Sequence, residues 1–295
     1  MEHCELLIVG AGAAGLAAAE GAWSAGCRDI VVADRAPQPG GILPQCVHRG
    51  FGLSTFGQEL TGPEYAARII ERLNATGVRL LMETEVLSVT KERRAVLSWR
   101  VGLAEYGFDK LILAAGCRER AIGSLPVAGT RPAGVFTAGQ AQELINLRHQ
   151  ELADHVLILG SGDLGMIMAR RFTLEGLSVD ALIEQERHYG GMARNYHRCI
   201  LPYSIPILYR TTVTEIHGEG RIRGVTLLNL DSGAREYVPC GTLITALGLI
   251  PERELLRGLG NPDWLFLAGN CNQAHDIVDS AVAEAEAVGK KAAGR

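Results

Sequence analysis

Short hydrophobic runs alternate along the chain with glycine-rich turns and with segments of helical periodicity. An apolar run at residues 5–9 leads into three glycines and an alanine-rich segment, and a second run follows at 29–34. The same succession begins again at residues 156–159 and continues through a helical segment to a run at 179–184. A strand, a glycine turn, a helix and a second strand make up a β-α-β unit. The pattern therefore predicts two such units in one chain.

Further helices and strands are predicted around these two units. The spacing of apolar residues predicts helices over 63–75 and 137–147, and Pro63 suits a first helical turn. Predicted strands lie at 78–82, 85–89, 95–100, 104–108, 110–114, 207–208, 214–216, 225–230, 236–238 and 242–246. Residues 123–132 have the composition of a linker. Each unit is therefore expected to combine a parallel sheet with a small meander of strands.

The length and the glycine content agree with a two-domain α/β protein. A chain of 295 residues accommodates two domains of the usual size, roughly 100 to 200 residues each. The 36 glycines against 11 prolines suit a fold with many tight turns between strands and helices. We predict two Rossmann-like domains, with residues 122–243 inserted into a discontinuous domain of residues 1–121 and 244–295.

Composition and charge exclude several classes of function. The net charge of −4 and the lack of a long basic block give no electrostatic reason to expect a nucleic-acid partner. The longest uncharged apolar stretch, residues 6–19, is shorter than the roughly 20 residues that cross a bilayer, so no membrane span or signal peptide is expected. The seven cysteines are scattered without a C-x-x-C pair, which predicts no metal or iron–sulfur site and a cytoplasmic protein with reduced thiols.

The first glycine turn has the sequence G-A-G-A-A-G, and Asp34 ends the next strand 24 residues after its first glycine. Gly10 permits the tight turn, Gly12 lets the backbone approach a pyrophosphate, and Gly15 lets the helix pack on the strand. The positive end of the following helix attracts phosphates. The Asp34 carboxylate would accept hydrogen bonds from ribose hydroxyls. This context predicts a dinucleotide site.

The second glycine turn, G-S-G-D-L-G, repeats the pattern with Glu184 at the same offset of 24 residues. Its glycines are Gly160, Gly162 and Gly165. A carboxylate at this position binds a free 2′-hydroxyl and repels the 2′-phosphate of NADP, so NAD is favoured. Arg187 and Arg194 follow closely and could approach a 2′-phosphate if Glu184 pointed away, which leaves NADP as the alternative.

The two sites resemble those of the thioredoxin-reductase-like class of pyridine nucleotide flavoproteins, in which a nicotinamide-binding domain interrupts an FAD-binding domain. The resemblance spans nearly the whole chain. Residues 111–116, L-I-L-A-A-G, and 246–251, A-L-G-L-I-P, are similar to the segments where this class crosses between domains. Residues 265–270, L-F-L-A-G-N, resemble its strand ending in Gly-Asp, whose carboxylate binds the ribityl chain of FAD. Asn270 replaces that aspartate here, and its side-chain carbonyl can still accept a ribityl hydroxyl.

The glycine patterns and the resemblance together imply FAD in the first domain and NAD in the second. The candidate FAD residues are Gly10, Gly12, Ala13, Ala14, Gly15, Asp34, Arg35, Gly41, Ile42, Val86, Ala115, Gly116, Gly269, Asn270, Asp276 and Ile277. The candidate NAD residues are Gly160, Ser161, Gly162, Asp163, Leu164, Gly165, Glu184 and Gly248. The helix that starts near Asp276 would favour negative charge on reduced flavin; the alternative is that Asp276 only caps the helix. Hydride transfer between nicotinamide and flavin needs stacking and orientation more than a side-chain acid or base.

Disulfide-reducing members of this class carry two cysteines close in sequence, because exchange proceeds through a mixed disulfide. After Gly40 and Gly41, where one branch has C-x-x-x-x-C, this chain has only Cys46. Cys46 could act singly with its pKa lowered by His48, or it could simply be a packed side chain. A stand-alone NADH oxidase or single-cysteine reductase and a non-catalytic flavoprotein therefore remain as alternatives.

Several segments resemble a narrower family, the oxidoreductase subunit that accompanies anaerobic glycerol-3-phosphate dehydrogenases, and recur in subunits of opine oxidases and amine dehydrogenases. The matching segments are 40–53, 59–66, 129–139, 162–165, 168–171 and 275–279. The resemblance implies an electron-transfer role beside a dehydrogenase subunit that handles the organic substrate, with glycerol 3-phosphate as the first expectation. A cysteine-rich C-terminal segment, present in several opine-oxidase-type relatives, is absent, so any iron–sulfur carrier is expected in another polypeptide. A homo-oligomer is also compatible with the sequence.

Overall fold

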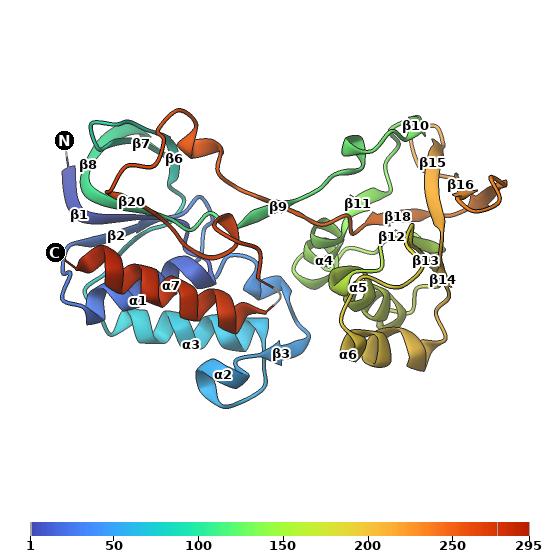
Figure 1. Ribbon diagram of the computed structural model, residues 1–295, viewed down its shortest axis with the longest axis horizontal. Helices are drawn as coiled ribbons and strands as arrows, with labels where there is room; N and C mark the ends of the chain where they lie inside the picture. Colours follow the sequence, from blue (N-terminus) through green and yellow to red (C-terminus); the bar gives the residue numbers. More distant parts are fainter. Residues whose placement is uncertain (1, 276, 295) are drawn as a thin grey trace. The chain divides into compact units, whose positions relative to one another are not determined.

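The computed structural model describes residues 2–275 and 277–294 and divides into two compact units (Figure 1). Unit 1 is Met1–Arg118 with Ile250–Arg295, and unit 2 is Glu119–Leu249. The predicted α/β fold, with one domain inserted into a discontinuous second domain, is confirmed. The chain crosses between the units at 118/119 along β9 (Cys117–Glu119) and at 249/250 along β19 (Leu249–Pro251), where the sequence predicted boundaries at 121/122 and 243/244.

Unit 1 is built on a sheet whose central strands run parallel. β1 pairs with β2 and β8, β2 pairs with β5, and β8 pairs with β20, all in parallel. β8 also pairs antiparallel with β7, and β7 with β6, which forms a meander. The strand bounds are β1 (Glu2–Val9), β2 (Ile30–Ala33), β5 (Arg79–Leu81), β6 (Glu85–Val89), β7 (Arg94–Trp99), β8 (Gly102–Leu113) and β20 (Leu265–Leu267).

A single long strand, β8, replaces the two strands that the sequence predicts at 104–108 and 110–114. The prediction of two strands was wrong because two charged residues in the middle of β8, Asp109 and Lys110, resemble a turn between strands. Instead, Asp109 Oδ1 lies 3.3 Å from His3 Nε2 of the neighbouring strand β1. Lys110 donates to the carbonyl oxygens of Ala292 and Gly294 at 2.6 and 2.8 Å, which satisfies the end of a helix. Both charges are therefore accommodated without interrupting the strand.

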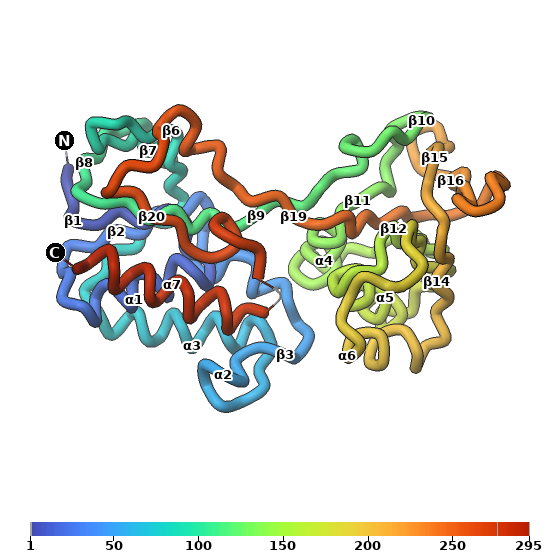
Figure 2. The backbone as a smooth tube through the Cα atoms, in the orientation of Figure 1, coloured from blue at the N-terminus to red at the C-terminus, as the bar shows by residue number. Residues whose placement is uncertain are grey.

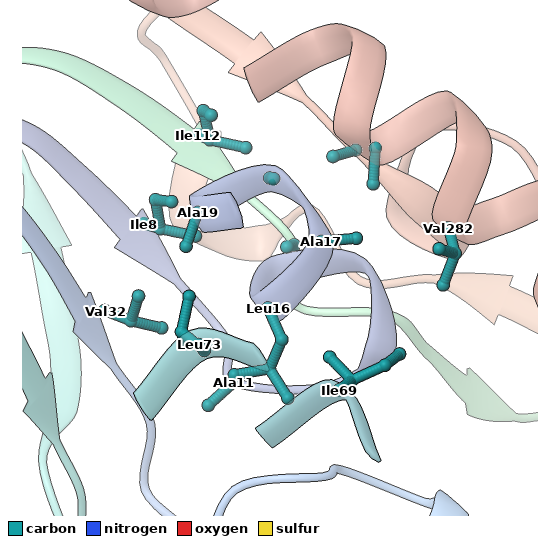
Figure 3. Close-up of a cluster of buried hydrophobic side chains, with 14 of the residues drawn as sticks. Ile8, Ala11, Leu16, Ala17, Ala19, Val32, Ile69, Leu73, Ile112 and Val282 are labelled. Atoms are coloured by element: carbon teal, nitrogen blue, oxygen red, sulfur yellow. The ribbon is translucent and has the colours of Figure 1, made fainter. Parts of the chain in front are cut away.

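Three helices, α1 (Ala13–Ser24), α3 (Gly62–Asn74) and α7 (Val278–Ala293), lie side by side against this sheet (Figures 1 and 2). Figure 3 shows the core between them, to which the strands, α1, α3 and α7 all contribute. The labelled side chains are Ile8, Ala11, Leu16, Ala17, Ala19, Val32, Ile69, Leu73, Ile112 and Val282. Within residues 2–275 and 277–294, no helix is long and apolar enough to cross a membrane.

A segment between β2 and α3 leaves the sheet and leads into α3 (Figure 1). It contains β3 and β4, which pair antiparallel at its base. Its elements are η1 (Leu43–Gln45), β3 (Arg49–Phe51), α2 (Leu53–Phe56) and β4 (Leu60–Thr61). Thr61 then caps α3 by a reciprocal hydrogen-bond pair with Glu64, which explains why this helix begins at Gly62.

Unit 2 combines a five-stranded parallel sheet with a four-stranded sheet. The parallel strands follow the order β11-β18-β12-β13-β14, and the other sheet follows β10-β15-β16-β17. Part of the predicted linker, Ala128–Gly129, is itself strand β10. The remaining bounds are β11 (Val135–Thr137), α4 (Ala138–Asn146), β12 (Val156–Leu159), α5 (Asp163–Leu174), β13 (Val179–Ile183), α6 (Ala193–Asn195), β14 (Ile207–Leu208), β15 (Thr211–His217), β16 (Gly224–Asn229), β17 (Arg235–Pro239) and β18 (Thr242–Thr245).

Helices α1 and α7 approach each other through two glycines. A Cβ atom at Gly289 would lie 2.0 Å from the carbonyl oxygen of Ala18, and one at Gly21 would lie 2.3 Å from that of Glu286. Because both neighbours are backbone atoms, the helices would have to separate to admit a methyl group. The two glycines therefore allow the close packing of α1 against α7.

We expect Gly289→Ala to lower the free energy of unfolding by about 1–3 kcal/mol, because the added methyl group overpacks the helix pair. Urea denaturation followed by circular dichroism measures the effect. Gly123→Ala is the control, since a Cβ atom there meets nothing within 4 Å. Equal stability of the two variants would contradict the packing argument.

Candidate nucleotide-binding sites

The candidate FAD residues of unit 1 gather at one edge of its sheet. β1, β2, β8 and β20 run parallel, so the loops after them leave at their common carboxyl ends. These loops contain Gly10, Asp34, Gly116 and Gly269. Ligands of open α/β sheets bind outside the carboxyl ends of the strands. Unit 2 repeats the arrangement, with Gly160 after β12, Glu184 after β13 and Gly248 after β18.

The first glycine of each turn has the same strained backbone. Gly10 and Gly160 both have a φ of 109°, a value that residues with a side chain rarely adopt. A Cβ atom would lie 2.4 Å from the Ala114 carbonyl oxygen at Gly10 and 2.3 Å from the Ala246 carbonyl oxygen at Gly160. Each turn therefore lies directly against the end of the neighbouring parallel strand.

A carboxylate fastens each glycine turn to the end of the second strand. Asp34 Oδ2 accepts the Ala11 N–H at 2.6 Å, and its Oδ1 accepts the Ala36 N–H at 2.8 Å. Glu184 Oε2 accepts the N–H of Ser161 at 3.1 Å and its hydroxyl at 2.5 Å. Each carboxylate keeps unused lone pairs that can accept ribose hydroxyls. The two acids thus hold the glycine turns by hydrogen bonds and can still accept hydrogen bonds from a nucleotide.

The amino-terminal ends of α1 and α5 can receive phosphates. Gly12 and Gly162 stand at their N-cap positions, and neither helix has a side-chain cap among the residues that the structure describes. The first-turn N–H groups of a helix have no partner within it, and together with the helix dipole they form an anion site. The glycine turns and the uncapped helices therefore fit a dinucleotide pyrophosphate in both units.

A second pair of glycines completes the site in unit 2, and the sequence analysis missed it. Gly190 and Gly191 follow Gly160 at the spacing of 30 residues that separates Gly40 from Gly10. The Gly190 N–H donates to Ser161 Oγ and the Gly191 N–H to the Ser161 carbonyl, both at 3.1 Å. This equal spacing is the signal that could have identified them.

Each glycine pair lies against its glycine turn. The Gly40 N–H donates to the Ala11 carbonyl at 2.8 Å. A Cβ atom at Gly41 would lie 2.9 Å from Gly12 Cα, and one at Gly191 would lie 2.8 Å from Asp163 N. These two glycines therefore admit no side chain without displacing the turn.

The Asp163 carboxylate is used within the protein. Its Oδ1 accepts the Met192 N–H at 2.7 Å and the Asn195 side-chain amide at 2.6 Å. It therefore holds the segment that follows the Gly190–Gly191 pair. A contact between this carboxylate and NAD stays a prediction.

The candidate residues near α7 are partly engaged with each other. Asn270 Oδ1 accepts the His275 N–H at 3.1 Å, and Asn270 Nδ2 donates to Cys117 Sγ at 3.8 Å. The carbonyl keeps one lone pair for a ribityl hydroxyl. Ile277 occupies the N-cap position of α7. Asp276 lies outside the described residues, so its two alternative roles remain predictions.

The other candidates lie at the places that their sequence positions imply. In unit 1, Arg35, Ala115 and Gly116 follow parallel strands, and Ile42 follows Gly41. Ala13, Ala14 and Gly15 begin α1, and Val86 lies in the meander strand β6. In unit 2, Leu164 and Gly165 lie in the first turn of α5, and Gly248 follows β18. Their contacts with nucleotides stay predictions. The structure brings most of them to the two carboxyl edges, and Val86 is the one that belongs to a different part of its sheet.

The surroundings of Cys46 do not favour a reactive thiolate. Burial raises the pKa of the Cys46 thiol to about 12, whereas the reactive-cysteine hypothesis needs a lowered pKa. Its Sγ faces the Ile42 carbonyl oxygen at 3.4 Å. His48 Nδ1 lies 3.2 Å from the Arg49 carbonyl oxygen, and its ring packs on Phe51 with the centroids 5.0 Å apart. All seven cysteines are free thiols, and the described residues contain no metal-binding group.

The chain matches a family model described as pyridine nucleotide-disulphide oxidoreductase over residues 4–263. The hydrogen cyanide synthase subunit HcnB of Pseudomonas aeruginosa is 29% identical over 298 residues, covering 90% of this chain and 62% of that protein. An opine oxidase subunit of Agrobacterium tumefaciens (strain Ach5) is 30% identical over 282 residues, covering 87% of this chain and 54% of that protein. This chain thus spans less than two thirds of both relatives.

The same architecture occurs in solved structures. Thioredoxin reductase of Lactococcus lactis, in the FR conformation, superposes with a TM-score of 0.79 at 18% identity, covering 98% of this chain and 97% of that chain. Identity at this level establishes the shared fold alone. The two-domain architecture expected from the sequence therefore has a counterpart in a known fold.

The paired glycines generate a reciprocal prediction. Gly41→Ala should weaken FAD retention and Gly191→Ala should weaken NADH binding, each about tenfold, because the added Cβ atom displaces a phosphate-facing turn. Each variant should leave the other nucleotide's affinity unchanged. Flavin fluorescence and isothermal titration with NADH give the two affinities. Loss of both nucleotides in either variant would indicate general unfolding instead of a local effect.

Proposed function

The chain belongs to the pyridine nucleotide-disulphide oxidoreductase family, and we propose that it relays electrons between NADH and a partner subunit of a dehydrogenase complex. It is an FAD-dependent pyridine nucleotide oxidoreductase that uses FAD and NAD(P)H. FAD, when bound, supplies a ring that exchanges a hydride with the nicotinamide and passes electrons onward. The observation that carries the proposal is the repeated turn geometry, combined with a single cysteine after the Gly40–Gly41 pair whose pKa is raised by burial.

In this scheme, the chain's own residues bind and orient FAD and NADH. In unit 1, the α1 amides would hold the FAD pyrophosphate and Asp34 the adenosine ribose. In unit 2, the α5 amides and Glu184 would do the same for NADH. None of these groups moves a proton, which suits hydride transfer, because this reaction depends mainly on alignment of the two rings.

Electron relay is favoured over disulfide reduction. A dithiol is needed for exchange through a mixed disulfide, and burial raises the pKa of Cys46, the thiol nearest the Gly40–Gly41 pair in sequence, to about 12. The two relatives named above are both described as subunits, which supports a partner polypeptide. For the organic substrate we propose glycerol 3-phosphate, on the sequence resemblance alone. The free thiols support a cytoplasmic location.

NADH is the proposed nucleotide because of the surroundings of Glu184. Its side chain is 8% exposed and is directed at Ser161, so a 2′-phosphate would meet a fixed negative charge. Arg187 pairs with Asp231 at 3.2 Å, and Arg210 pairs with the same carboxylate oxygen at 2.9 Å. In this arrangement Arg187 is paired with Asp231, which supports NADH as the proposed nucleotide.

Anaerobic titration of the yellow protein with NADH tests the proposed function. We expect NADH to bleach the visible absorbance of bound flavin, and an artificial electron acceptor to restore it. A protein that cannot be reconstituted with FAD, or a flavin that NADH leaves oxidised, would overturn the proposal; the latter result fits a non-catalytic flavoprotein. Cys46→Ser should titrate like the unaltered protein, and loss of turnover in this variant would favour the single-cysteine reductase instead.

Glu184→Gln should reduce the preference for NADH over NADPH by about tenfold, because a neutral amide neither repels a 2′-phosphate nor accepts ribose hydroxyls as strongly. The ratio of kcat/KM values for flavin reduction by the two nucleotides measures this change. Glu186→Gln is the matched control, since Glu186 is an exposed neighbour that contacts Glu184 through its backbone N–H. An unchanged ratio in Glu184→Gln would refute the role of its charge.

A further inference from the structure

We propose that Asp279 is a positioning residue that fastens residues 42–61, called the strap here, along the FAD site. The inference rests on the proposed binding of FAD by unit 1. Asp279 lies in the first turn of α7 and is 7% exposed. Fully buried carboxylates are rare unless they are paired or hydrogen-bonded. Its partners therefore indicate what its burial achieves.

The hydrogen bonds that the described residues donate to Asp279 come from one turn of the strap. Its Oδ2 accepts the Gly52 N–H at 3.1 Å. Its Oδ1 accepts the Thr55 N–H at 2.9 Å and the Thr55 hydroxyl at 2.6 Å. The Thr55 hydroxyl also lies 3.1 Å from the Tyr65 hydroxyl, in α3. This set joins the strap to α3 and to α7, and Asp279 is 224 residues away from Thr55 in sequence.

The strap connects the two ends of the proposed FAD site. It begins after Gly41, which lies against Gly12 in the phosphate-binding turn. Its tip at 52–55 is bonded to the first turn of α7, where Ile277 is a candidate flavin residue. The backbone N–H of Gly62, directly after the strap, donates a hydrogen bond to the Cys46 carbonyl oxygen at 2.8 Å. FAD held between these ends would be retained by the strap.

Unit 2 fastens its corresponding segment in a comparable way. There, the segment after Gly190–Gly191 is held by Asp163, in the first turn of α5. The corresponding position in α1 is Ala13, which has no carboxylate. In unit 1 the carboxylate is instead supplied by α7. The use of a carboxylate in the first turn of a helix to hold the segment after a Gly-Gly pair is therefore common to both units.

Two variants test the hydrogen bonds between Asp279 and the strap, called the latch here, by different means. Asp279→Asn places an amide opposite N–H and O–H donors, so it cannot satisfy all of them. Thr55→Val removes the hydroxyl and leaves the Asp279 charge in place, and Thr55→Ser restores the hydroxyl. Asp263→Asn is the matched control, because Asp263 is an exposed aspartate of the same unit.

We expect FAD to dissociate about tenfold faster from Asp279→Asn and Thr55→Val than from the unaltered chain. Thr55→Ser and Asp263→Asn should keep the original rate. The FAD-free protein provides a second measurement, because Arg49 is an exposed trypsin site within the strap. Cleavage after Arg49 should accelerate in the first two variants.

The reduction potential of bound flavin separates positioning from general destabilisation. Asp279→Asn should raise the potential, because it removes a negative charge from the helix end nearest the proposed flavin. Thr55→Val should leave the potential unchanged while still releasing FAD faster. Unchanged dissociation and trypsin resistance in both variants would overturn the proposal. If the unaltered chain itself binds no FAD, the proposed function fails, whereas the trypsin result still decides whether the latch exists.

Discussion

The bond between a strand-end carboxylate and a glycine-turn amide is the interaction on which both nucleotide sites depend. Asp34 binds the Ala11 N–H at 2.6 Å, and Glu184 binds the Ser161 N–H at 3.1 Å. Each bond joins the loops after two adjacent parallel strands. It fastens a turn whose first glycine has a φ of 109°, a conformation that glycine adopts readily and residues with a side chain do not. Because the same acid is the proposed ribose ligand, one side chain would both hold the turn and bind the nucleotide.

The two units use this common site in different surroundings. In unit 2, Asp163 in the first turn of α5 holds Met192 and Asn195, directly after the Gly-Gly pair. In unit 1, the tip of the strap is held by Asp279 from the last helix of the chain. Flavin is retained through many turnovers, whereas NADH must enter and leave in each one. A fastened strap along the proposed FAD site would fit this difference.

The strap also bears on the kind of reaction. In the class that the sequence resembles, one branch carries its redox dithiol at this point. This chain has a single thiol there, and burial raises its pKa to about 12. A segment that no longer reacts with a disulfide can still retain the cofactor. The structural role proposed for the strap does not require the dithiol.

Much of the fold was predictable because local patterns report local structure. Both β-α-β units, both glycine turns and the positions of Asp34 and Glu184 follow from apolar spacing and from a constant offset of 24 residues. The continuity of β8 was not predictable, since the partners of Asp109 and Lys110 lie in β1 and at the end of α7. Two adjacent charged residues predict an interruption of a strand unless their partners, which are distant in sequence, are known.

The sequence by itself determined the class of protein, the two nucleotide sites and the absence of a dithiol, because glycines, strand-end acids and cysteine spacing are properties of neighbouring residues. Only the tertiary structure decided the state of Cys46, the engagement of Arg187 by Asp231, and the contact between Asp279 and Thr55. Burial and long-range hydrogen bonds arise from how segments pack, and residues 224 positions apart carry no joint signal in a single sequence.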